Sequence, residues 1–134
     1  MADLYAWPAL ATIAALAVYL ASFVLAGRMR GKHRVVAPST DGPEEFKRAQ
    51  RIQANTLEQI VPFLASLWLF AINVSPLWAA ALGAVWIAGR VFYMVSYFRD
   101  PAKRGPGFVL AAAAWIALLA GALIGVICRL AVLS

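Results

Sequence analysis

Three polar side chains recur at helical spacing in a stretch that becomes almost wholly apolar after residue 60. Arg51, Asn55 and Glu58 stand at positions i, i+4 and i+7, which places them on one face of a helix. Gln53 adds a further polar group in the same segment. Charged side chains inside a membrane helix are costly, so they indicate function by default. This face could offer a guanidinium to a carboxylate and a carboxylate to an amine.

A second polar set occurs in the next apolar stretch. Arg90, Tyr93 and Tyr97 are spaced i, i+3 and i+7, so they also share a helical face, and Arg104 follows in the short segment beyond it. Single members have ordinary explanations, because Tyr97 could belong to an interfacial aromatic belt and Arg104 could anchor a cytoplasmic loop. Those explanations do not account for an arginine and a tyrosine at the same depth as a glutamate and an asparagine.

The residues alone leave two interpretations of these sets open. Glu58 and Arg90 would lie at similar depth on antiparallel helices, so they could form a purely structural ion pair. Alternatively, several guanidiniums around one carboxylate and two phenols would bind a small, net anionic ligand with more than one carboxylate and an amine. Glutathione meets that description, and a donor or cation beside its thiol would favour the reactive thiolate.

Four apolar stretches must position these side chains, and they predict an all-α, integral membrane four-helix bundle in a single domain. Hydrophobic residues make up 63% of the 134 residues and charged residues 13%, against about half and about a quarter in soluble domains. We expect helices at about residues 5–26, 46–72, 77–98 and 108–133. Each is roughly 20 residues or longer, enough to cross a hydrocarbon core of ~30 Å.

Ten of the twelve basic residues lie in two segments between apolar stretches, which predicts that both segments are cytoplasmic and both termini are outside. The orientation in the membrane therefore explains the net charge of +6. We expect no nucleic-acid partner. Compact loops and the lack of an evident retrieval tail favour a bacterial inner membrane. His33 and Cys128 are isolated from other ligand types, so no metal site is expected.

Residues 51–58, RIQANTLE, resemble the motif of the membrane-associated proteins in eicosanoid and glutathione metabolism (MAPEG). Glu45, Phe46 and Arg48 resemble the approach to that motif, and Gly89 with the second polar set resembles the family's second cluster. The resemblance covers nearly the whole chain and is nearest to the microsomal glutathione transferase and leukotriene C synthase branch. It implies a homotrimer of four-helix subunits, with glutathione bound at the cytoplasmic side between neighbouring subunits.

The resemblance also implies roles for individual residues. Arg51 would hold a carboxylate of glutathione, Glu58 the γ-glutamyl amine and Arg104 the thiolate. The other residues expected at the glutathione site are Arg30, Gln53, Asn55, Arg90, Tyr93 and Tyr97. A hydrophobic electrophile or lipid would enter sideways from the bilayer. The implied activity is conjugation of glutathione to that electrophile, and reduction of lipid hydroperoxides is open to the same thiolate.

Two positions depart from the leukotriene C synthase branch. Gln59 stands in place of a tyrosine, and Gly31 stands in place of an arginine, for which Lys32 could substitute. Both departures argue against leukotriene synthesis as such. Two alternatives to a transferase remain, a non-catalytic lipid-binding protein resembling the five-lipoxygenase-activating protein and a small transporter. The glutathione-type polar set counts against the first, and the lack of broken helices or inverted repeats counts against the second.

Overall fold

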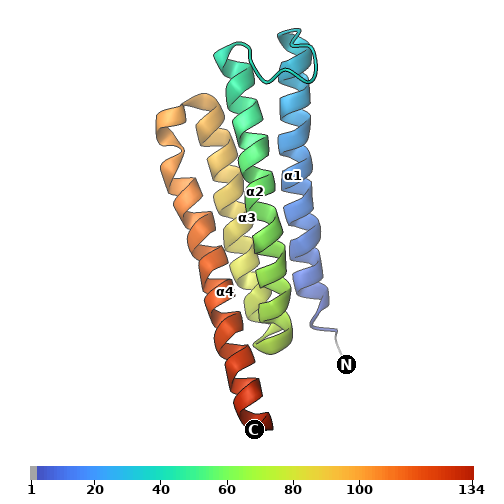
Figure 1. The fold of residues 1–134 in the computed structure, drawn as a ribbon, viewed down its shortest axis with the longest axis vertical. Helices are drawn as coiled ribbons and strands as arrows, with labels where there is room; N and C mark the ends of the chain where they lie inside the picture. The colour runs from blue at the N-terminus through green and yellow to red at the C-terminus, as the bar shows by residue number, and fades with distance from the viewer. Residues whose placement is uncertain (1–2) are drawn as a thin grey trace.

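Four long helices form an up-and-down bundle in the computed structural model, which describes residues 3–134 (Figure 1). The helices are α1 (Ala6–Lys32), α2 (Glu44–Asn73), α3 (Pro76–Arg99) and α4 (Gly105–Leu133), with a short 3-10 helix, η1 (Pro101–Lys103), between α3 and α4. All four long helices have the length and apolarity needed to cross a membrane. The prediction of an all-helical, four-helix membrane protein is therefore confirmed. Both termini lie at one end of the bundle, and the α1–α2 connection lies at the other.

The ends of the helices differ from the predicted ranges, most of all in α1. This helix continues six residues past the predicted end at residue 26, to Lys32, and α2 begins at Glu44 rather than at residue 46. The apolar run marks only the part of a helix that lies in lipid. Arginine and lysine have high helix propensity, so α1 continues beyond the apolar run through Arg28 and Arg30.

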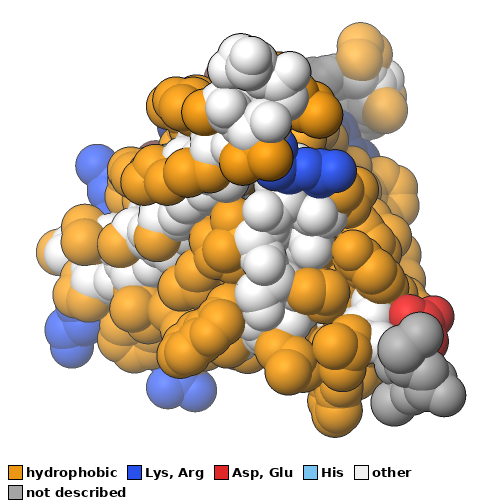
Figure 2. Space-filling model, turned by 90° about the horizontal axis from the view of Figure 1, so that it is seen from below, with side chains coloured by type: hydrophobic (Ala, Val, Ile, Leu, Met, Phe, Trp, Pro, Cys, Tyr) orange, Lys and Arg blue, Asp and Glu red, His pale blue; other side chains and the backbone are white. Residues whose placement is uncertain are grey.

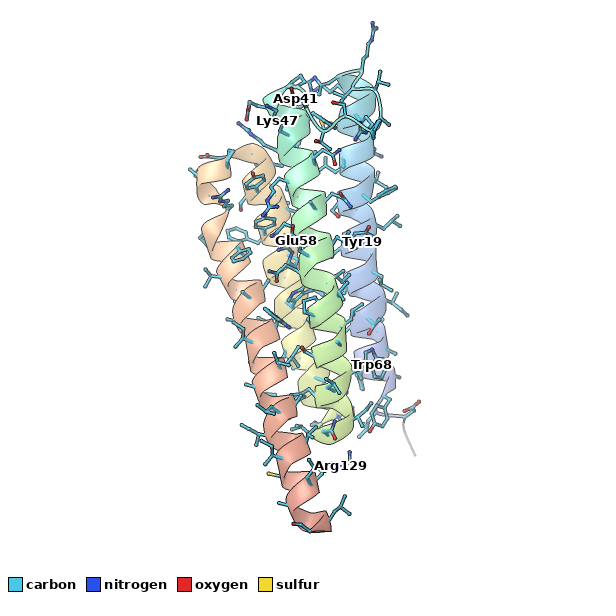
Figure 3. All side chains as sticks on the ribbon, viewed as in Figure 1. Tyr19, Asp41, Lys47, Glu58, Trp68 and Arg129 are labelled. Carbon is cyan, nitrogen blue, oxygen red and sulfur yellow. The ribbon has the colours of Figure 1, made fainter. Side chains whose placement is uncertain are left out.

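Polar contacts pin the α1–α2 connection to the helix ends. Arg30 Nη1 donates to the backbone oxygen of Ser39 at 2.8 Å, and Lys47 Nζ lies 3.1 Å from Asp41 Oδ1 at the upper end of Figure 3. The Lys47 ammonium, which donates a hydrogen bond to Asp41, holds the pKa of that carboxyl below its ordinary value. The loop between the two helices is thus held by the cations that flank it.

The apolar core fills the half of the bundle nearer the termini and holds α2 against its neighbours. Phe63 of α2 and Trp86 of α3 stack with their ring centroids 4.0 Å apart, and both are fully buried. The indole of Trp68 donates to Thr12 Oγ1 of α1 at 3.1 Å. Such indole bonds satisfy polar groups that lipid could not solvate. Both α2 and α3 contact every other long helix of the bundle.

The outer surface of the bundle is apolar along most of its length. Leu10, Ile13 and Ile124 each expose more than half of their surface. Seen from the end where the termini lie, the molecule is largely hydrophobic, with few charged side chains (Figure 2). Exposed apolar surface on this scale is stable in lipid but not in water. The chain is built as an integral membrane protein.

Candidate functional site

Two glycines let α3 and α4 approach closely enough for their backbones to touch. A Cβ atom on Gly107 would lie 2.8 Å from the Cα of Tyr93, and one on Gly89 would lie 2.7 Å from the backbone nitrogen of Ala111. Real side chains do not tolerate such distances, so both positions require glycine. The close approach places the first turn of α4 beside Tyr93. This contact lies toward the end of the bundle that carries the α1–α2 connection, which we call the charged end.

A cleft of about 360 Å³ opens between α2, α3 and α4 at this end. Its walls come from residues of all three helices, namely Arg51, Asn55, Tyr93, Arg104, Gly105, Phe108 and Val109. Four of these side chains were predicted from the sequence, Arg51, Asn55, Tyr93 and Arg104. The structure brings them together from positions up to 53 residues apart in the chain, from residue 51 to residue 104. The cleft is therefore the strongest candidate for the functional site.

Glu58 shares the polar face of α2, as the spacing predicted. Arg51 Nη1 lies 3.4 Å from Glu58 Oε1, and Asn55 Nδ2 donates to Glu58 Oε2 at 3.4 Å. Arg51 and Glu58 are both more than half exposed at the surface of the chain, and 3.4 Å is long for a charged hydrogen bond. Figure 3 shows Glu58 near the middle of α2, well below the charged end. A ligand with a carboxylate and an amine could therefore replace this pair at low cost.

Arg90 lies behind the cleft, with 1% of its surface exposed. Its Nη1 donates to Asn55 Oδ1 and its Nη2 donates to Thr56 Oγ1, each at 2.8 Å. Its guanidinium carbon also lies 4.3 Å from the ring centroid of Tyr93. Within residues 3–134, Arg90 forms no ion pair, so the structural pair considered between Arg90 and Glu58 is not present. Glu58 lies on the exposed edge of the polar face, whereas Asn55 and Thr56 point inward.

Thr56 was missed by the sequence analysis. It is 2% exposed, and its hydroxyl accepts from Arg90 while donating to the backbone oxygen of Ile52 at 2.7 Å. Threonine commonly bonds to its own helix in this way, so its position gave no separate signal. A buried guanidinium such as that of Arg90 needs several hydrogen-bond acceptors. A search for acceptors near Arg90 could therefore have found Thr56. Phe108 and Val109 were also missed, because apolar side chains at the start of a membrane helix are unremarkable.

Arg104 and Tyr93 line the cleft, whereas Tyr97, which was also predicted at the site, is buried and is not among the lining residues. Tyr93 and Tyr97 stack with their centroids 5.6 Å apart, and the Arg104 guanidinium carbon lies 5.8 Å from the Tyr97 centroid. Arg104 immediately precedes α4, and its guanidinium forms no hydrogen bond or ion pair in the described part of the chain. The positive end of the α4 dipole points the same way. An anion placed here would meet an unpaired cation and a helix N-terminus.

Arg30 and Gln53 do not join this cleft. They line a separate groove of about 290 Å³ between α1 and α2, together with Phe23 and Gln50. Arg30 is also engaged with the loop, and its guanidinium carbon lies 5.0 Å from the Phe46 ring centroid. Within this chain, the predicted glutathione residues thus line two separate sites, the cleft and the α1–α2 groove. Across residues 3–134, no three His, Cys, Asp or Glu side chains gather as metal ligands would.

Comparisons with known proteins match the chain to one family. The MAPEG family profile matches residues 8–124. An uncharacterized protein of the cyanobacterium Synechocystis sp. is 45% identical over 96% of this chain and 93% of its own length. Microsomal glutathione S-transferase 2 of Mus musculus is 36% identical over 77% of this chain and 70% of its own length. Leukotriene C4 synthase of Cavia porcellus is 37% identical over 88% of this chain and 80% of its own length.

Proposed function

Because the chain belongs to the MAPEG family, we propose that it is a membrane glutathione S-transferase. It would transfer glutathione to lipophilic electrophiles that dissolve in the bilayer. The observation that carries this proposal is the cleft that unites Arg51, Asn55, Tyr93 and Arg104. The named glutathione transferase and leukotriene C4 synthase among its relatives support the same class of activity.

Glutathione would bind by replacing hydrogen bonds between side chains of α2, namely those that Arg51 and Asn55 donate to Glu58. Arg51 would turn from Glu58 to a carboxylate of the tripeptide, because a guanidinium fork binds carboxylates with two parallel hydrogen bonds. Glu58 would then accept from the γ-glutamyl amine. Asn55 is held from behind by Arg90, so its amide would present a fixed donor to the ligand. Arg90 acts in this scheme as a positioning residue.

The chemistry requires the thiol of glutathione to lose its proton at neutral pH. A free thiol has a pKa of about 8.5, and a neighbouring cation or helix N-terminus lowers it. Arg104 and the first turn of α4 would supply both influences to a sulfur lying over Tyr93. The proton passes to water, the thiolate forms a bond to the electrophilic carbon, and the leaving group departs with the electron pair. Arg104 would thus favour the state from which the reaction proceeds.

The second substrate would arrive from lipid. Phe108 and Val109 form the apolar wall of the cleft, and Val109 is 63% exposed on the outer face of α4. An electrophile dissolved in the membrane could lie against this wall with its reactive carbon next to the thiolate. Holding both reactants in this geometry can lower the barrier by several kcal/mol. A lipid hydroperoxide could be reduced by the same thiolate, with a second glutathione completing a disulfide.

We further propose that the active form is a homotrimer with the cleft at a subunit boundary and on its cytoplasmic side. Arg30 and Gln53 belong to the α1–α2 groove, while the cleft lies on the α2–α4 side. In a ring of subunits these two sides face neighbouring copies, so Arg30 and Gln53 of one subunit would complete the cleft of the next. The two separate locations in one chain are what such an arrangement requires.

The proposal is tested by an activity screen on the detergent-purified protein. The protein is mixed with glutathione and either a chromogenic aryl halide or a lipid hydroperoxide, beside the variants Arg51→Ala and Glu58→Ala. A transferase loses most of its turnover at subsaturating glutathione in both variants. Glutathione at 100 times its Kd should also stabilise the wild-type protein by ~2.7 kcal/mol. A protein that shows neither turnover nor stabilisation would be a lipid-binding scaffold instead.

A further inference from the structure

A second amphiphilic groove lies between α1 and α3, away from the glutathione cleft. It has a volume of about 390 Å³, and its walls are apolar, with Leu25 on α1 and Met94 and Phe98 on α3. Arg28 and Arg99 line the same groove at its cytoplasmic end. In Figure 1, α3 lies partly behind α2.

The two arginines of this groove are unpaired. Across residues 3–134, neither Arg28 nor Arg99 forms an ion pair or a side-chain hydrogen bond, and both are exposed. Two lysines at this end are engaged by contrast, since Lys32 pairs with Glu45 and Lys47 pairs with Asp41. Two free guanidiniums at one end of an apolar groove are complementary to a molecule with an anionic head and a hydrocarbon tail.

The height of the arginines fits the boundary between hydrocarbon and headgroups. At ~1.5 Å per residue, Arg28 lies about 33 Å from the start of α1 and Arg99 about 35 Å from the start of α3. A hydrocarbon core of ~30 Å that begins near the outer ends of these helices would end just below both guanidiniums. The apolar walls of the groove lie below them, at the depth of acyl chains.

We propose that this groove binds an anionic phospholipid of the cytoplasmic leaflet. Arg28 and Arg99 hold the phosphate, because guanidinium forks match phosphate oxygens. One acyl chain lies along Leu25, Met94 and Phe98. These three side chains pack against the small buried cluster of Ile52, Tyr93 and Tyr97. The lipid therefore contacts side chains that pack against the cluster containing Tyr93, which lines the glutathione cleft.

The test measures which lipids remain bound when the protein leaves a bilayer. Full-length protein is placed in nanodiscs of equal parts phosphatidylglycerol and phosphatidylcholine, and retained lipids are counted by native mass spectrometry. We expect the wild-type protein to favour phosphatidylglycerol by about 25-fold, since each arginine should contribute roughly fivefold. The double variant Arg28→Gln/Arg99→Gln should retain the two lipids about equally.

A matched control removes the same charge elsewhere. Arg34 and Lys103 are exposed cations of the same end that do not line the groove. The Arg34→Gln/Lys103→Gln variant should keep the preference, and Arg28→Lys/Arg99→Lys should keep a large part of it. Cooperative thermal unfolding of each variant in the same detergent, compared with the wild-type protein, verifies that it is folded.

Three results would overturn the proposal. The first is a wild-type protein without preference for phosphatidylglycerol. The second is an equal loss of preference in both Gln double variants, which would indicate diffuse attraction to the basic surface. The third is a preference that glycerol 3-phosphate abolishes at millimolar concentration, which would make the groove a site for free phosphate esters rather than for lipid.

Discussion

Substitution of Thr56 by valine tests how the buried arginine is held. Valine keeps the shape of threonine but removes the oxygen that accepts from Arg90 Nη2 at 2.8 Å. The buried Nε atom of Arg90 already has no partner in the described part of the chain, so Thr56→Val leaves a second donor of the same guanidinium unsatisfied. We expect Thr56→Val to destabilise the protein and to weaken glutathione binding without touching the ligand.

The magnitude follows from the charge of the donor. Hydrogen bonds to charged groups contribute about 1.5–3 kcal/mol, and those between neutral groups about 0.5–1.5 kcal/mol. Thr56 is fully buried, so water cannot take the place of its hydroxyl. The loss in the free energy of unfolding should be about 2–3 kcal/mol. Asn55, which shares Arg90 with Thr56, should then lose its fixed orientation, and the Kd for glutathione should rise.

A matched control exists in α1. Thr12 also donates to the backbone oxygen four residues earlier and accepts across helices, but its donor is the neutral indole of Trp68 at 3.1 Å. Thr12→Val should cost about 1 kcal/mol and leave the Kd for glutathione unchanged. Both free energies are measured by reversible unfolding in mixed micelles, and the Kd values by calorimetry. If the two variants lost equal stability, the assigned role of Thr56 would be wrong.

Three further outcomes are expected. Arg104→Ala should lower kcat by about 100-fold or more, as the removal of one preorganised donor does in other enzymes, while the Kd for glutathione in calorimetry changes only a few-fold. Gly107→Ala should destabilise the protein by about 1–3 kcal/mol through overpacking against Tyr93. Gly27 has open space around it, so Gly27→Ala should be neutral or stabilising in the same unfolding assay. Glu58→Gln should raise the Kd for glutathione about 10-fold to 100-fold if that carboxylate binds the amine; an unchanged Kd would remove Glu58 from the site.

Much of the fold could be predicted from the sequence because lipid imposes simple rules. A helix must cross ~30 Å, and only apolar runs of about 20 residues do so, which is why the number of helices was found correctly. The ends were less certain, since a helix can leave the membrane and continue in water. The extension of α1 to Lys32 illustrates this, because nothing in the composition of residues 27–32 separates a loop from a solvated helix turn.

The candidate site was predictable wherever helical spacing alone decides the neighbours. Arg51, Asn55 and Glu58 share one helix face because an α-helix has 3.6 residues per turn. In the structure, Arg51 and Asn55 both contact Glu58. Contacts between helices depend on rotation about each helix axis, which one sequence does not reveal. For that reason the buried Arg90 was paired with Glu58 in one interpretation, whereas the structure pairs it with Asn55 and Thr56.

The separation of Arg30 and Gln53 from the cleft has a similar origin. The resemblance to the family implied that both contact glutathione, but it could not place them on a particular face of one subunit. Only the packing of α1 against α2 shows that they lie in another groove. Their contribution to the cleft is therefore a proposal about assembly, and cross-linking of Gln53→Cys to a cysteine at Val109 of a neighbouring copy would support it directly.

In the proposed mechanism, Arg104 and the N-terminus of α4 lower the pKa of a thiol bound in the cleft. The ultraviolet absorbance of the glutathione thiolate, recorded against pH on glutathione-saturated wild-type protein and on Arg104→Ala, measures that pKa. We expect ionisation well below the ordinary pKa of about 8.5 in the wild-type protein, and a return toward that value in the variant. If bound glutathione ionised at the same pH as free glutathione, with or without Arg104, the mechanism would be wrong.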